Sequence, residues 1–132
     1  MLIRSLGILE KNDASCCGIT ITQCHAIVEI GRKGTISLID LADLLCVDKS
    51  TMSRTTENLV EAGLADRDVD SSNRRYVCIQ LTKKGQSVFQ SIEDSMTDYF
   101  KCILEAITED KREQVFESLT LLTDAVANSK HC

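Results

Sequence analysis

The chain has 132 residues, a net charge of −5 and an apolar content of 43%, which fits one globular domain and excludes a disordered chain. No apolar run is long enough to span a membrane, and the first residues lack the cleavage pattern of a signal peptide. We therefore expect a cytoplasmic protein without membrane contacts, whose seven cysteines are thiols, metal ligands or redox centres and not a closed disulfide framework.

The stretch TITQCHAIVEIG, residues 20–31, predicts the first helix of the core. Thr20 and Gln23 have the spacing of a capping box, in which each side chain bonds the backbone N–H of the other residue. Gly31 and Gly34 predict the end of this helix, because glycine is the preferred residue just beyond a helix C-terminus.

Two further helices follow, separated by the short turn CVD. The stretch SLIDLADLL, residues 37–45, predicts a helix with Ser37 as its N-cap. The stretch DKSTMSRTTENLVEAG predicts a second helix, capped by Asp48 or Ser50 and ended by Gly63. Three apolar residues are expected on its buried side: Met52, Leu59 and Val60. Two short helices joined by a tight turn match the spacing of a helix-turn-helix.

The hydrophobic pattern then changes to that of strands. LADRDV and YVCIQLT are rich in β-branched and aromatic residues and predict two strands. The polar stretch DSSNRR, residues 70–75, predicts the turn between them. A hairpin with a basic tip directly after a helix-turn-helix makes a winged helix, so the predicted fold is mainly α with a small β-hairpin wing.

Two apolar stripes at helical spacing occupy the C-terminal part of the chain. The first runs from Lys83 to Ile107, and the second follows Thr108, which is expected to cap the last helix. Both stripes could be ordinary intramolecular core, but the length of the first favours a homodimer interface. We expect a single domain, with a DNA-binding core at about residues 20–85 and dimerisation segments at about residues 1–15 and 86–132.

At this point the sequence resembles the MarR family of bacterial winged-helix regulators. The stretch GLADRDVDSSNRRYVCIQLTKKG, residues 63–85, is similar to the wing signature of that family, and DLADLLCVDKSTMSRTTENLVEAG is similar to its helix-turn-helix. Two features depart from the pattern: Asn73 replaces the usual aspartate at the wing tip, and the N-terminal helix is short. The resemblance implies a dimeric transcriptional regulator, by default a repressor, that binds a roughly palindromic operator in double-stranded DNA.

The resemblance also implies that the helix beginning at Lys49 enters the major groove. Nine residues are candidates for DNA contact, six on this helix and three on the wing: Lys49, Ser50, Thr51, Ser53, Arg54, Thr55, Asn73, Arg74 and Arg75. Arg54 is the best candidate for a bidentate contact to guanine, whereas the wing arginines suit the minor groove or its phosphates. For any single hydroxyl, the alternative role of helix cap or solvated surface is at least as good.

The stretch DASCCGITITQCH contains three cysteines and a histidine that we predict to form one effector site: Cys16, Cys17, Cys24 and His25. Thiols that precede a helix N-terminus favour thiolate. Three roles stay open: binding of a thiophilic metal or metalloid such as Zn(II), sensing of an oxidant, or structure alone. Three other cysteines lie in apolar patterns and are expected in the core: Cys46, Cys78 and Cys102.

Two other classes of function compete with the regulator. A small thiol redox enzyme would use Cys17, and a winged-helix protein-interaction module would suit the acidic total charge. The sequence lacks the nucleotide-binding, zinc-protease and nucleophile-elbow motifs of common enzymes. A basic wing also has no role in an enzyme, so we expect none. The acidic charge lies mostly in residues 86–132, with nine acidic and four basic groups, which leaves the middle of the chain suited to DNA.

Overall fold

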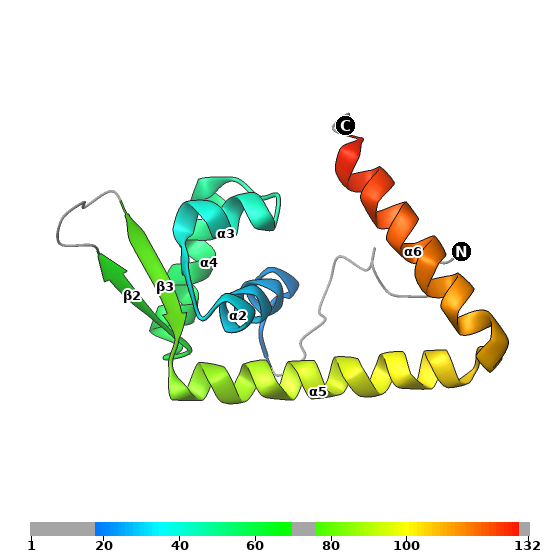
Figure 1. Cartoon of the computed structure of the whole chain (residues 1–132). Helices are drawn as coiled ribbons and strands as arrows, with labels where there is room; N and C mark the ends of the chain where they lie inside the picture. Colours follow the sequence, from blue (N-terminus) through cyan, green and yellow to red (C-terminus); the bar gives the residue numbers. More distant parts are fainter. Residues whose placement is uncertain (1–17, 70–75, 130–132) are drawn as a thin grey trace. The chain divides into compact units, whose positions relative to one another are not determined.

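The computed structural model describes residues 18–69 and 76–129 (Figure 1). Its elements in chain order are α2 (Ile21–Lys33), β1 (Thr35–Ser37), α3 (Leu38–Leu44), α4 (Lys49–Glu61), β2 (Ala65–Val69), β3 (Val77–Leu81), α5 (Lys83–Glu105) and α6 (Glu109–Asn128). These elements confirm the predicted class, mainly helical with a small antiparallel wing. The chain divides into two compact units between Glu93 and Asp94, and none of the described helices is long and apolar enough to cross a membrane.

Helix α2 begins with the predicted capping box. The backbone N–H of Gln23 donates to Thr20 Oγ1 at 3.2 Å, and the backbone N–H of Thr20 donates to Gln23 Oε1 at 2.9 Å. The prediction that Gly31 ends the helix was wrong, because α2 continues to Lys33 and ends at Gly34. Gly31 serves a different purpose: a Cβ at this position would lie 2.5 Å from the ring of Phe89 on α5, so glycine permits close packing there.

The replacement Thr20→Ala is expected to lower the free energy of unfolding by about 1 kcal/mol, because it leaves the Gln23 N–H without its cap. Urea denaturation followed by circular dichroism would measure the change. Thr108→Ala is the matched control, since Thr108 stands at the N-cap of α6 and makes no side-chain cap hydrogen bond. An equal loss in both variants would show that the capping box contributes nothing of its own.

The helix-turn-helix consists of α3 and α4. Ser37 Oγ accepts the backbone N–H of Asp40 at 3.0 Å, and Asp48 Oδ1 accepts that of Thr51 at 2.9 Å, so Asp48 and not Ser50 caps α4. Hydrogen bonds from the side chain and then from the backbone of Thr51 lower the pKa of the Asp48 carboxyl. The cap is therefore charged at neutral pH.

The sheet has three strands in the order β1-β3-β2, all antiparallel. Ile79 at the centre of β3 pairs with Ile36 on β1 and with Arg67 on β2. The sequence predicted the hairpin of β2 and β3 but not β1. That strand has only three residues, Thr35–Ser37, which is too short for an alternating pattern.

One aliphatic core joins the helix-turn-helix to the sheet. Its most deeply buried side chains come from α2, α3, α4 and β3: Ile27, Ile30, Leu41, Met52, Leu59 and Ile79. The predicted burial of Val60 was wrong, as 37% of this residue is exposed. The inward face of α4 instead uses Thr56, whose hydroxyl donates to the backbone oxygens of Met52 and Ser53 at 3.0 and 2.9 Å. These contacts leave the opposite face of α4 open to solvent.

Helix α6 carries its apolar stripe on the surface of the described chain. None of its residues is buried, and Leu121 is 71% exposed. The largest exposed apolar side chains of α6 are these: Phe116, Leu119, Leu121, Leu122 and Val126. Thr108 stands at the N-cap position but its side chain makes no cap hydrogen bond, so only the position of the predicted cap is right.

Candidate nucleic-acid interface

The first half of α4 presents three predicted contact residues to solvent. Lys49, Ser50 and Arg54 are all exposed, and Ser50 and Arg54 lie on the side of the helix opposite the buried Met52 and Leu59. The carboxylate of Asp48 already occupies the N-terminus of α4, where it accepts the backbone N–H of Thr51. The positive charge available to a DNA phosphate is therefore that of the Lys49 and Arg54 side chains.

The other three candidates on α4 use their hydroxyls within the protein. Thr51 Oγ1 donates to Asp48 Oδ2 at 2.6 Å, and Ser53 Oγ donates to Glu57 Oε1 at 3.2 Å. Thr55 is only 7% exposed, and its hydroxyl donates to the backbone oxygen of Thr51 at 2.9 Å. Met52 and Leu59, which are buried, lie three residues before and four residues after Thr55, so Thr55 is on the same inward side of the helix. The prediction that Thr55 faces DNA was therefore wrong.

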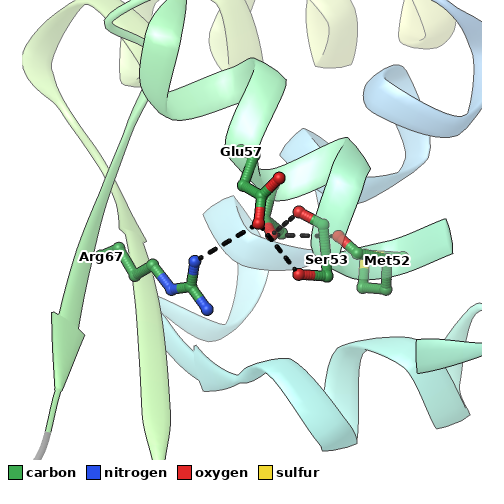
Figure 2. Close-up of polar contacts among 5 residues, drawn as sticks. Met52, Ser53, Glu57 and Arg67 are labelled. Carbon is green, nitrogen blue, oxygen red and sulfur yellow. Dashed lines mark hydrogen bonds and ion pairs between the residues drawn. The ribbon is translucent and has the colours of Figure 1, made fainter. Parts of the chain in front are cut away.

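An ion pair joins α4 to the wing, and sequence analysis did not predict it. Nη1 of Arg67 on β2 lies 3.8 Å from Glu57 Oε1, the same oxygen that accepts the Ser53 hydroxyl (Figure 2). The three side chains thus form a chain of polar contacts from the wing to α4. The sequence shows only an acidic residue on a helix and a basic residue on a strand, and no local pattern brings them together.

Two hydrogen bonds link the C-terminal end of α4 to the start of α5. Thr82 Oγ1 donates to the backbone oxygen of Gly63 at 2.6 Å, and Lys84 Nζ donates to that of Ala62 at 3.0 Å. Gly85 lies so close to Leu64 that a Cβ on it would stand 1.9 Å from the Leu64 carbonyl oxygen. These contacts fix the position of the C-terminal end of α4 relative to the start of α5.

The predicted wing tip, with Asn73, Arg74 and Arg75, lies outside the described residues. The strands that flank it are paired as far as Val69, which stands opposite Val77.

The cysteine segment is described only in part. Cys16 and Cys17 lie outside the described residues, whereas Cys24 is half-buried against the core and His25 is exposed. Ile19, which directly precedes the cap residue Thr20, also packs on the core. In residues 18–69 and 76–129, no three histidine, cysteine or acidic side chains are arranged to hold a metal ion. The predicted effector site therefore remains a prediction.

The expectation that three other cysteines lie in the core was wrong. Cys46 and Cys102 are exposed, and Cys78 is half-buried. Cys46 has a φ of 53° in the turn between α3 and α4, and this conformation is uncommon for a residue other than glycine. Apolar neighbours along the sequence do not ensure burial where the backbone turns the side chain outward.

Comparison with known proteins identifies this architecture. The model of the MarR family matches residues 19–77. The chain is 27% identical to the HTH-type transcriptional regulator FarR of Neisseria gonorrhoeae, over 81% of this chain and 80% of that protein. It is 22% identical to the HTH-type transcriptional regulator YfiV of Bacillus subtilis, over 98% of this chain and 81% of that protein. These relatives are named as regulators, which confirms the expectation that the chain is not an enzyme.

A solved structure supports the fold. FabT of Streptococcus pneumoniae, solved in complex with DNA, matches with a TM-score of 0.85 at 21% identity, over 98% of this chain and 92% of that one. At this identity the likeness concerns the fold alone. It agrees with the winged-helix arrangement built above from the helices and strands.

Proposed function

We propose that this chain, which belongs to the MarR family, is a transcriptional regulator that binds double-stranded DNA as a homodimer and acts as a repressor. The observation that carries the proposal is the first half of α4, where Lys49, Ser50 and Arg54 are all exposed to solvent. The core and the contacts at Gly63 and Gly85 hold this helix in place, so its outward face is preorganised for the major groove.

The homodimer part of the proposal is supported by the apolar surface of the second unit. Exposed aromatic and aliphatic side chains lie on the second half of α5 and along α6, with Leu121 the most exposed. Apolar surface of this kind favours burial against another protein. A two-fold dimer would present two copies of α4 to half-sites about one DNA turn apart, near 34 Å.

DNA titration at several salt concentrations tests the proposed function. Binding to a selected palindromic sequence should exceed binding to random DNA, and the affinity should fall steeply as salt rises, because Lys and Arg side chains displace counterions from phosphates. Light scattering at micromolar concentration should give twice the chain mass. Equal affinity for all sequences, or no binding at low salt, would contradict a regulator that recognises an operator.

For regulation, we infer that Cys16, Cys17 and Cys24 form an effector site, with His25 or a group from the partner subunit as a fourth member. Such a site would bind a thiophilic metal or metalloid such as Zn(II), or react with an oxidant. Drawing Cys17 towards Cys24 would shift the start of α2. Because α2 packs against α4 in the core, that shift would alter the position of the recognition helix and so the DNA affinity.

The replacements Cys17→Ser and Cys24→Ser are expected to leave DNA binding intact while abolishing its response to zinc, arsenite or peroxide. DNA titrations with and without each agent measure the response. Cys102→Ser is the matched control, since this exposed thiol lies on α5 in the second unit. If the two variants respond as the unmodified protein does, the cysteine segment is structural only.

A further inference from the structure

The hydroxyl of Ser53 donates its proton in a hydrogen bond to a neighbouring side chain on the same helix. Ser53 Oγ lies 3.2 Å from Glu57 Oε1, one helical turn further along α4. An ionised carboxylate only accepts hydrogen bonds, so the serine must donate its single proton to Glu57. For a ligand, Ser53 then offers only the lone pairs of its oxygen.

Arg67 holds this arrangement from the wing. Its Nη1 lies 3.8 Å from the same oxygen of Glu57, and the side chains of Arg67 and Glu57 are 34% and 54% exposed. An exposed pair of this kind contributes little to the stability of the fold. Its effect is on the surface that α4 presents, because the guanidinium partly cancels a negative charge that would otherwise repel DNA phosphates.

Ser53 and Glu57 share a helix face with the residues proposed to contact DNA. Ser53 and Arg54 lie three and four residues after Ser50 and four and three residues before Glu57, which places these residues on one side of a helix. That side is opposite Met52 and Leu59, which are buried in the core. Figure 2 shows the Ser53 and Glu57 side chains next to each other on α4, with Arg67 reaching towards Glu57 from its strand.

The resulting surface accepts hydrogen bonds and donates none at Ser53 and Glu57. In the major groove of DNA, cytosine and adenine offer an exocyclic amine as donor, whereas guanine and thymine show acceptors there. An acceptor-only surface can therefore bond cytosine N4 or adenine N6, but it leaves guanine O6 or thymine O4 without a partner. An unsatisfied polar group in an interface carries a cost in affinity.

We propose that Ser53 and Glu57 select, at one position of each half-site, a base that offers an exocyclic amine, either cytosine or adenine. Arg67 acts as a positioning residue, since it works through Glu57 and does not itself contact the base. This inference rests on the proposed function, because it assumes that α4 lies in the major groove.

Selection of bound sequences from a random DNA library, using the full chain, tests the proposal. The unmodified protein should retain cytosine or adenine at one half-site position, by about 5-fold or more over the other bases, as expected for a specific base contact. Ser53→Ala should remove that preference. Glu57→Gln should shift it towards guanine or thymine, because the glutamine amide can donate to Ser53 Oγ and release the serine proton for the base.

Arg67→Gln separates positioning from direct contact. With Glu57 present, this replacement should weaken the base preference and lower the affinity for all sequences. In the Glu57→Gln background it should have a much smaller effect, because no carboxylate remains to be held or neutralised. An equal loss of affinity in both backgrounds would overturn the positioning role and assign Arg67 to a direct phosphate contact.

Glu61→Gln is the matched control for charge. It removes the same charge from the same helix, and Glu61 makes no hydrogen bond or ion pair with the described residues. Its selected sequences should equal those of the unmodified protein. If Ser53→Ala and Glu57→Gln also select unchanged sequences, the inference is overturned although the protein is still a DNA-binding regulator. If the unmodified protein selects no sequence at all, the proposed function itself fails.

Discussion

The replacement Gly85→Ala is expected to destabilise the DNA-binding unit by about 3 kcal/mol or more, as for severe overpacking of a core. The added Cβ would stand 1.9 Å from the Leu64 carbonyl oxygen and 2.9 Å from its carbon. Both are backbone atoms, so relief requires α5 to move away from the end of α4. Alanine favours a helix over glycine by roughly 1 kcal/mol, which offsets only part of this cost.

Chemical denaturation of the purified variant measures this effect. Gly63→Ala serves as the control: Gly63 has a φ of 71°, and a Cβ there would meet no atom within 4 Å. The control should cost roughly 1–2 kcal/mol through backbone strain alone. A Gly85→Ala variant as stable as the unmodified protein would mean that the close approach of α5 to Leu64 does not hold in solution.

The replacement Arg54→Ala is expected to weaken binding to the selected operator by about 1–3 kcal/mol, or roughly 5- to 150-fold, and to relax one base position. Arg54 is exposed on the outward face of α4, where its planar guanidinium can bond guanine O6 and N7 together. The fold should be unchanged, because the side chain lies away from the core.

Arg54→Lys is the informative comparison. Lysine keeps the charge but cannot make the planar bidentate contact, so its affinity for random DNA should stay near that of the unmodified protein while the base preference falls. Arg74→Ala and Arg75→Ala should instead weaken binding to most sequences alike, since wing contacts are mainly to the DNA backbone and to groove shape. Unchanged affinity in all of these variants would exclude α4 and the wing from the DNA interface.

Short-range signals in the sequence were enough to predict most of the secondary structure and the order of its elements, but not the short strand β1. The capping box at Thr20, the cap at Ser37 and the end of α4 near Gly63 are all confirmed, because a cap depends on residues three or four positions apart. The hydrophobic periodicity of the sequence also predicted β2, β3 and the two C-terminal helices. A winged helix-turn-helix could therefore be predicted from local chemistry and the order of the elements.

The candidate site was predictable only as a region. The sequence placed Lys49, Ser50 and Arg54 on a recognition helix, and the exposed face of α4 agrees with that. It was wrong about Thr55, although Met52 and Leu59, which were predicted to be buried, lie three and four residues from it on the same side of a helix. In the structure, contacts of α2 and the sheet with α4 bury that side.

Several features of the protein depend on contacts between residues that are distant in the sequence, and only the tertiary structure shows them. The ring of Phe89 explains why Gly31 lies within α2 and does not end it, and Leu64 explains why Gly85 must be glycine. The pairing of β1 with β3 and the ion pair between Glu57 and Arg67 likewise join elements that no local pattern relates. Helix caps and hydrophobic periodicity are properties of a short segment. Close packing and ion pairs between elements form only when folding has brought separate segments of the chain together.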